Sequence, residues 1–336
     1  MLSEFQKEML QELAIDSKPA YSYDECMQLF KGQSKGEEAF NEFDDAKKLF
    51  RELVYLCGED ELAFLQMVVE LSEKKEPWQD DVKYYPFRAF AFNNFAFLFN
   101  YEDCFHLVMP SEFIEIYRLV IGGENFNESS NLNQEYHTYA EALCNLYGAY
   151  EIKQFANVWN KHHKDKITTQ EAEEFLSTKQ CLNCDYYLGE GFVIHDCLFD
   201  DDFDELLEST HGQEYYMPSK SVIKEYAKKG YTEPDSKEYI EMNEFLLQFV
   251  ENESVMENLL LDIMISCERL WGPNEIVDTL KTAELPIKDA NFCSKFERLY
   301  NNLRDTVHIW ELRGHLPHQY KTATGNSIVH FSFAKT

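Results

Sequence analysis

The segment from residue 133 to residue 204 constrains the fold most, because it reads as three short amphipathic helices followed by a hairpin. Apolar residues recur every three or four positions in EYHTYAEALCNLYG and again in AYEIKQFANVWN, which is the spacing of a half-buried helix. Thr168 and Glu171 mark the start of a third helix, TTQEAEEFLSTKQ, since each side chain can bond the backbone N–H of the other. The hairpin DYYLGEGFVIHD follows and turns at Gly189-Glu190-Gly191, where glycine allows positive φ. This order predicts a winged helix-turn-helix.

A second unit of the same order is predicted upstream. Helices are expected over 37–56 and 59–72, the first of them ended by Gly58 as a C-terminal cap. The aromatic stretch after them allows two hairpins: one turns at Asn93-Asn94, and in the other FAFLFNY pairs with CFHLVM around Glu102-Asp103. We favour the second, because a helix, EFIEIYRLV, then follows it, as a helix follows the downstream hairpin. The aromatic rings are expected in the core, since base-stacking sites need more basic neighbours than this stretch has.

The whole chain is predicted to be mainly α with small β-hairpins. Tandem winged-helix-like units over 36–120 and 133–209, joined by the polar linker GGENFNESSNLN, follow N-terminal helices within 1–35. A C-terminal helical domain is expected over 215–313, and 314–336 is a tail whose alternating IVHFSF could pair as a strand or stay loose. The helices of that domain are expected to begin near caps or prolines, and the last is expected to run to Leu312; the starting residues are Pro218, Asp235, Ser254, Pro273 and Asp289.

Charge is the strongest functional signal in the composition. The 336 residues carry 61 acidic and 31 basic side chains, for a formal net charge of −30, and acids exceed bases in every third of the chain. Phosphate backbones are bound by Lys and Arg, so such a chain repels nucleic acid except at a local basic patch. A basic protein is therefore the expected partner, although the same charge could serve solubility alone.

Motifs for catalysis and for membrane insertion are missing from the sequence. It contains no run of 18 or more apolar residues and no signal-peptide pattern, so a cytoplasmic protein is expected. Its nine cysteines are an odd number, and Cys57, Cys144 and Cys267 fall in apolar helical stripes, as reduced buried thiols do. The signatures of phosphate, dinucleotide, metalloprotease and hydrolase sites are absent. We therefore expect a non-enzymatic protein with no cofactor.

Four residues around the downstream hairpin have the types that a zinc site needs. Cys181 and Cys184 form a C-x-x-C, and His195 and Cys197 follow on a strand, where alternate residues share a face. Against zinc, there is no second C-x-x-C, and the hairpin already closes through its glycines. No bound metal is therefore expected.

The basic run KHHKDK lies between the second and third helices of the downstream unit. In a DNA-binding winged helix, the third helix enters the major groove. Here that helix carries Glu171, Glu173 and Glu174, which would face phosphates with the wrong sign. The two histidines and Lys161 are expected instead to complement the C-terminus of a helix, and direct nucleic-acid binding is not expected.

Arginines and histidines gather near the C-terminus. An arginine followed by a histidine after four to six residues is the pattern of HEPN-type ribonucleases, and Arg313 and His318 have that spacing across a glycine and a proline. Arg304 and His308 lie on one face of the expected last helix, but only three residues separate them. The alternative function is thus a ribonuclease or nucleic-acid-binding regulator that uses Arg304 and His308. The competing interpretation is that they are ordinary cations at a helix end.

Several short segments resemble a family of uncharacterised bacterial, largely Firmicute, proteins. That family often carries a C-terminal SEC-C zinc motif and sometimes an N-terminal Rho-type domain. The matching segments are LYGAYEIKQFANVWNKHHKDKIT, VIHD, EYYMPSKSVIKEYAKKGY and IWELRGHLPHQY, which together span about 145 to 320. The final GNSIVHFSFAKT holds no cysteine, so the zinc motif of the family is absent here. The resemblance therefore bears on the fold more than on the function.

The acidic run after the downstream hairpin is the expected binding site for a basic partner. It begins a helix, where one or two acids would suffice to match the positive helix start; its members are Asp200, Asp201, Asp202, Asp204 and Glu205. We predict a non-enzymatic interaction protein. A nucleic-acid-mimicking inhibitor or regulator of a nucleic-acid-handling enzyme, as in a phage or defence setting, is one form that it could take.

Overall fold

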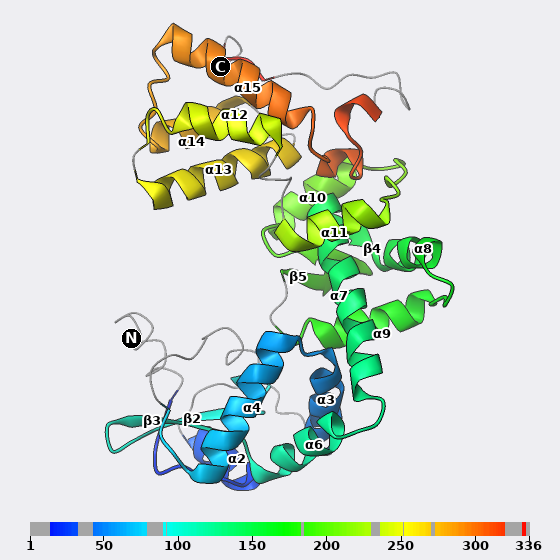
Figure 1. Cartoon of the computed structure of the whole chain (residues 1–336), viewed down its shortest axis with the longest axis vertical. Coiled ribbons are helices and arrows are strands. Elements are labelled where there is room, and N and C mark those ends of the chain that lie inside the picture. The colour runs from blue at the N-terminus through cyan, green and yellow to red at the C-terminus, as the bar shows by residue number, and fades with distance from the viewer. Residues whose placement is uncertain are drawn as a thin grey trace. The chain divides into compact units, whose positions relative to one another are not determined.

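The computed structural model describes residues 14–32, 43–78, 90–91, 93–182, 185–229, 236–250, 252–269, 273–319 and 331–333 (Figure 1). Within these ranges the protein is mainly helical with two small β-sheets, so the predicted class, mainly α with small β-hairpins, is confirmed. None of the described helices has the length and the apolar content needed to cross a bilayer. Of the N-terminal helices expected within 1–35, the first lies outside the described residues and the second is α2, Tyr23–Gly32.

The chain divides into two compact units. Unit 1 comprises Met1–His137 and Glu174–Cys184, and unit 2 comprises Thr138–Glu173 and Asp185–Thr336. Two helices contribute residues to both units, and they are α7 (Phe126–Tyr147) and α9 (Thr169–Lys179). The division thus assigns 174–184, which the sequence placed in the downstream winged-helix-like unit, to unit 1.

Unit 1 combines helices with a three-stranded sheet, and its hairpin is the one favoured from the sequence. Strands β2 (Phe97–Tyr101) and β3 (Cys104–Val108) pair antiparallel. Glu102 and Asp103 have φ angles of 52° and 59°, the left-handed pair that a two-residue hairpin turn needs. A short strand that the sequence did not predict, β1 (Ile15–Asp16), pairs parallel to β2. Besides α2, the described helices of this unit outside α7 and α9 are α3 (Phe43–Leu56), α4 (Glu59–Lys74) and α6 (Ser111–Ile121).

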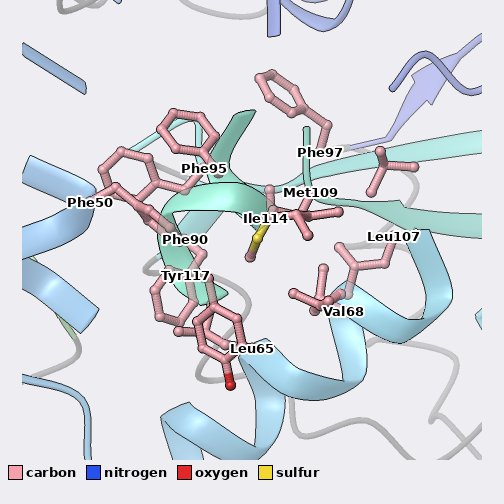
Figure 2. Close-up of a cluster of buried hydrophobic side chains, with 14 of the residues drawn as sticks. Phe50, Leu65, Val68, Phe90, Phe95, Phe97, Leu107, Met109, Ile114 and Tyr117 are labelled. Carbon is pink, nitrogen blue, oxygen red and sulfur yellow. The ribbon is translucent and has the colours of Figure 1, made fainter. Parts of the chain in front are cut away.

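The core of unit 1 is built largely from the aromatic stretch. Phe90, Phe95 and Phe99 are fully buried, so their predicted place in the core is confirmed. Figure 2 shows side chains of α3, α4, α6 and the hairpin meeting around these rings. The Phe50 ring centroid lies 5.1 Å from that of Phe95 and 4.9 Å from that of Phe113, within the range of favourable aromatic pairs.

The polar linker predicted before residue 133 is wrong from Phe126 onward, because these residues are the first turns of α7. Their polar side chains have a structural task that local pattern does not reveal. Asn133 Nδ2 donates to the carbonyl oxygen of Tyr55 at 3.0 Å, and Gln134 Nε2 donates to that of Cys57 at 2.9 Å. Carbonyl groups at the C-terminal end of a helix have no partner within that helix. The side chains of Asn133 and Gln134 supply the missing donors at the end of α3.

Gly58 has a different role from the one predicted. Its φ of −78° and ψ of −175° are extended, and it is the N-terminal cap of α4 instead of the C-terminal cap of α3. Its N–H donates to Glu61 Oε2 at 2.8 Å. The end of α3 is satisfied from elsewhere in unit 1, since buried Lys179 donates through Nζ to the carbonyl oxygen of Leu56 at 2.9 Å.

Unit 2 contains a second three-stranded sheet. The helix expected from Ala149 begins only at Ile152, and the residues before it form a strand, β4 (Ala149–Glu151), followed by α8 (Ile152–His162). Gly148, with a φ of 68°, ends α7 and turns the chain into this strand. The predicted hairpin is confirmed as β5 (Tyr186–Gly189) and β6 (Phe192–His195). Its sheet order is β4-β6-β5, all antiparallel.

The start of α9 follows the predicted capping pattern. The Thr168 N–H donates to Glu171 Oε2 at 2.7 Å, and the Glu171 N–H donates to Thr168 Oγ1 at 3.1 Å. At the hairpin turn, Glu190 and Gly191 both have positive φ, of 51° and 85°. Both local predictions are therefore confirmed.

The rest of unit 2 is helical, as predicted, but several boundaries differ. The N-terminal cap of α12 is Ser236, and the predicted cap, Asp235, lies outside the described residues. The N-terminal cap of α13 is Asn252 instead of the predicted Ser254. The predicted cap Asp289 of α15 is confirmed, but α15 ends at Arg304 and not near Leu312. The elements are α10 (Asp200–Ser209), α11 (Lys220–Lys229), α12 (Lys237–Leu246), α13 (Glu253–Glu268), α14 (Pro273–Thr282), α15 (Ala290–Arg304) and the 3₁₀ turn η1 (Trp310–Leu312).

Candidate functional site

Helix α10 carries the acidic run that the sequence predicted as a binding site. Its inner face is apolar: Phe203 and Leu206 are buried against β4, β6 and Trp310. This packing fixes the opposite face of the helix toward solvent. Phe199, the N-terminal cap residue, supplies no side-chain cap, and its ring is 75% exposed. An aromatic ring is therefore presented at the start of an acidic helix.

The five predicted acids do not share one role. Asp201, Asp204 and Glu205 are exposed and have no ion pair among the described residues. Asp202 turns inward, and its Oδ1 lies 3.2 Å from Arg269 Nη1. The side chain of Asp200 lies outside the described part of the structure. Three carboxylates and the Phe199 ring thus form an exposed group, which we call the α10 face.

Asp202 belongs to a partly buried ion-pair chain that sequence reasoning missed. Arg269, at the end of α13, is 7% exposed, and its Nε lies 3.8 Å from Glu311 Oε1. It therefore joins α10 to η1 through two carboxylates. Because a buried guanidinium without partners is costly, Asp202 is needed there for stability. Asp202 and Arg269 are 67 positions apart in the sequence, so no local pattern indicates that they pair.

A buried carboxyl, that of Glu268, precedes Arg269 in the sequence. Glu268 is 1% exposed, and neither of its carboxyl oxygens has a hydrogen-bond partner among the described residues. Burial raises the pKa of Glu268 well above its ordinary value, and the positive charge of His195 opposes that rise. Glu268 is thus favoured in its neutral form.

His195, one of the four zinc candidates, is engaged with its neighbours in the chain. Its Nδ1 lies 3.1 Å from Asp196 Oδ1 and 3.2 Å from the backbone nitrogen of Cys197. Burial acts to lower the pKa of His195, but hydrogen bonds to Asp196 and Cys197 outweigh it and raise the pKa to about 10.

The other zinc candidates are divided between the two units or lie outside the described residues. Cys181 belongs to unit 1 and is half-buried, whereas His195 and Cys197 belong to unit 2. Cys184 lies outside the described residues. In the part of the chain that the structure describes, no group of three or more His, Cys, Asp or Glu is placed to hold a metal ion.

The basic run KHHKDK is tied to the end of α8. Lys166 Nζ donates to the carbonyl oxygens of Asn160 and His163, the latter at 2.6 Å. His162 bonds through its two ring nitrogens to Tyr139 Oη at 2.9 Å and to the carbonyl oxygen of Pro218 at 3.1 Å. These contacts fit the expectation that the run complements a helix C-terminus, with Lys166 instead of Lys161 bonding the carbonyls.

Arg304 and His308, the alternative catalytic pair, are both buried. Since α15 ends at Arg304, the predicted common helical face is wrong. Thr306 contributes to this end, because its hydroxyl bonds the carbonyl oxygen of Leu303 at 2.7 Å. His308 Nδ1 lies 2.6 Å from the carbonyl oxygen of Gly314, and burial lowers the pKa of His308 to about 4. At 3% and 8% exposure, the pair offers no accessible acid and base to a polymer.

The α10 face is therefore the predicted site that remains exposed. No sequence signal distinguished Asp202 from its neighbours, whereas the exposed Phe199 stands directly before the run and was overlooked. A large aromatic residue at a helix-capping position, where Ser, Thr, Asp or Asn is usual, is the signal that could have found it. Comparison with protein-family models, with curated proteins and with solved structures gave no match to this chain.

Proposed function

We propose that this is a non-enzymatic interaction protein that binds a basic protein partner through the α10 face. The observation that carries the proposal is the exposed group of Asp201, Asp204, Glu205 and the Phe199 ring. Buried interfaces favour aromatic anchors surrounded by polar groups. Lys and Arg fit such a face twice, because they pair with carboxylates and also stack on an aromatic ring.

Helix stability alone does not account for these acids. One or two acids near the N-terminus suffice to complement the helix dipole, and the effect fades within the first turn. Asp204 and Glu205 lie beyond that turn and are exposed, so they add repulsion without a partner inside the described chain. A basic partner would relieve that repulsion, and its association would be fast and sensitive to salt.

We also propose that the downstream unit is of winged-helix type. Supporting this are the element order α7, β4, α8, α9, β5, β6 and the antiparallel order β4-β6-β5. Support for the upstream unit is weaker: its hairpin is followed by α6, but its third strand, β1, comes from the N-terminal segment and runs parallel. The winged-helix assignment is thus better supported for the downstream unit than for the upstream unit.

The winged-helix proposal favours a mimic of nucleic acid over a binder of it. Its third helix would be α9, where Glu171, Glu173 and Glu174 are exposed and carry the wrong sign for phosphates. Carboxylates arrayed on a helix are instead suited to the basic groove of a nucleic-acid-handling enzyme. The proposed partner is accordingly an enzyme or regulator with such a groove.

Affinity capture from the native host at low and raised salt, followed by mass spectrometry, tests the proposal. The test variant combines Asp201→Asn, Asp204→Asn and Glu205→Gln. The matched control removes three exposed charges of unit 1 and combines Glu115→Gln, Glu124→Gln and Glu128→Gln.

The proposal expects a basic partner that is captured by the wild type and by the control, is released as salt rises, and is lost in the α10 variant. Capture that persists in the α10 variant, or that falls equally in the control, would show that the α10 face is not the binding site.

A further inference from the structure

The helical bundle of unit 2 exposes apolar side chains in a segment that is also strongly acidic. Eight large apolar side chains are exposed among the described residues, and five of them lie between residues 240 and 261. They are Ile240, Leu247, Phe249, Val255 and Leu261. Since single exposed apolar residues are common but concentrations of them are not, this distribution indicates a contact surface.

On α12 the exposed residues form one stripe. Ile240, Glu244 and Leu247 are spaced by four and three positions, which places them on the same face of the helix. The opposite face is the buried one, with Met242 and Leu246 in the core. Ile240 and Leu247 are 42% and 55% exposed and take no part in that core.

Phe249 follows Leu247 in the turn after α12 and packs against the core. Its ring is 43% exposed, yet its centroid lies 5.4 Å from that of Phe245 and 5.1 Å from that of Phe292. The core therefore fixes the orientation of an aromatic ring that remains open to solvent. A rigid ring of this kind loses little entropy on binding and is a good interface anchor.

The segment that carries the stripe is strongly acidic in sequence. The only base from 237 to 262 is Lys237, which pairs with Glu241 at 3.7 Å. Seven acids share this segment, and they are Glu238, Glu241, Glu244, Glu251, Glu253, Glu257 and Asp262. Such a field repels a second copy of the chain and an anionic membrane surface alike.

We infer that the stripe of Ile240 and Leu247 docks an amphipathic, basic helix of the protein partner. The inference rests on the proposed function and names a second contact for the same kind of partner. No strand edge is present on α12, so an extended peptide has nothing to pair with, whereas a helix can lay an apolar face along the stripe. Lys and Arg of that helix would meet Glu244, which lies between Ile240 and Leu247 on the stripe.

The test uses the full chain and a defined probe, a fluorescent Leu/Lys peptide of about 18 residues designed as an amphipathic helix of five turns. A scrambled peptide of identical composition keeps the charge and abolishes the apolar face. The test variant is Ile240→Ser with Leu247→Ser. The control is Leu119→Ser, at a more exposed apolar residue of unit 1.

The amphipathic probe should bind the wild type and the control about tenfold more tightly than the scrambled probe, and should lose about tenfold in the double variant. Equal affinity for the two probes, or an unchanged double variant, would overturn the inference. So would salt-dependent self-association of the chain that disappears in the double variant, because it would make a second copy the occupant.

The α10 variant separates this inference from the proposed function. If neutralising the α10 face abolishes probe binding while the α12 double variant keeps it, the stripe is not a docking site and the proposed function is untouched. If the α12 variant loses the probe and the α10 variant retains it, the inference stands whatever host capture shows.

Discussion

The side chain of Asn301 pairs with the backbone of Phe331 as one strand pairs with another. Its Nδ2 donates to the Phe331 carbonyl oxygen at 2.8 Å, and its Oδ1 accepts from the Phe331 N–H at 2.8 Å. The ring of Phe331 is buried beside Tyr300, with centroids 5.2 Å apart. Part of the predicted tail is thus held in the core of unit 2 by one amide.

Replacing Asn301 by alanine should lower the free energy of unfolding by about 1–3 kcal/mol, because both backbone groups of Phe331 lose a partner in a largely buried place. Asn302→Ala is the matched control, since Asn302 is exposed on the next position of α15. Urea denaturation measures both. Equal stability of the two variants would mean that the Phe331 contact contributes nothing.

Gly148 should tolerate no side chain. It has a φ of 68°, and a Cβ built on it would overlap the ring of Trp310, which is fixed by a 2.9 Å hydrogen bond from Nε1 to the carbonyl oxygen of Asn145. Gly148→Ala should therefore cost more than about 3 kcal/mol, from strain and overlap together. Gly191→Ala, with a φ of 85° but open space, should cost only about 1 kcal/mol. Thermal unfolding of the two variants compares them, and similar losses would refute the role of Trp310.

Local rules predicted what local residues decide. The Thr168–Glu171 capping box, the Glu102-Asp103 turn and the Asp289 cap each depend on residues within a few positions of one another, and all three are present. Predictions failed where a partner lies far along the chain. Asn133 bonds the carbonyl of Tyr55, 78 positions earlier in the sequence. Local polarity alone predicts a linker for this segment, which is the first part of α7.

The candidate site shows the same limit. The sequence indicated the acidic helix. It could not show that Asp202 forms an ion pair with Arg269 while the neighbouring acids Asp201, Asp204 and Glu205 stay exposed. Likewise, Arg304 and His308 have suitable chemistry by type, and only the end of α15 and their burial remove them from the surface. Residue type predicts what a group could do, and burial decides whether it can be reached.

The alternative ribonuclease function is open to a direct test. Labelled RNA and DNA incubated with the protein at low salt should remain uncleaved, because Arg304 and His308 are buried and His308 Nδ1 is bonded to Gly314. His308→Asn is a suitable comparison, since its amide can still reach that carbonyl and preserve the fold. Cleavage by the wild type that disappears in this variant would establish the alternative.

His195 should stabilise the fold most at neutral and acidic pH. Its pKa is raised to about 10 in the folded protein from an ordinary 6.5, so its contribution is complete below about pH 6.5 and is lost as pH rises through 10. His195→Gln should therefore be destabilised at pH 6, with a difference from wild type that shrinks toward pH 10. His211→Gln, at an exposed position, is the control and should show no such trend. A ring titration by NMR near 6.5 would contradict the prediction.

Glu268, whose pKa is also raised, should make the wild type lose stability as pH rises, in the same direction as His195 does. Burial raises the pKa of Glu268 in the folded protein above the unfolded value of 4.5. The contribution of Glu268 to the free energy of unfolding is therefore highest below pH 4.5 and declines as pH rises toward the folded pKa. Glu268→Gln cannot ionise and escapes this decline. The variant should gain stability relative to wild type as pH rises from about 5 to about 8, measured by urea denaturation at each pH. Glu257→Gln, exposed on the same helix, should differ from wild type by a constant amount. A flat difference for Glu268→Gln as well would mean that Glu268 is ionised in the folded protein, with His195 as the charge that offsets its burial.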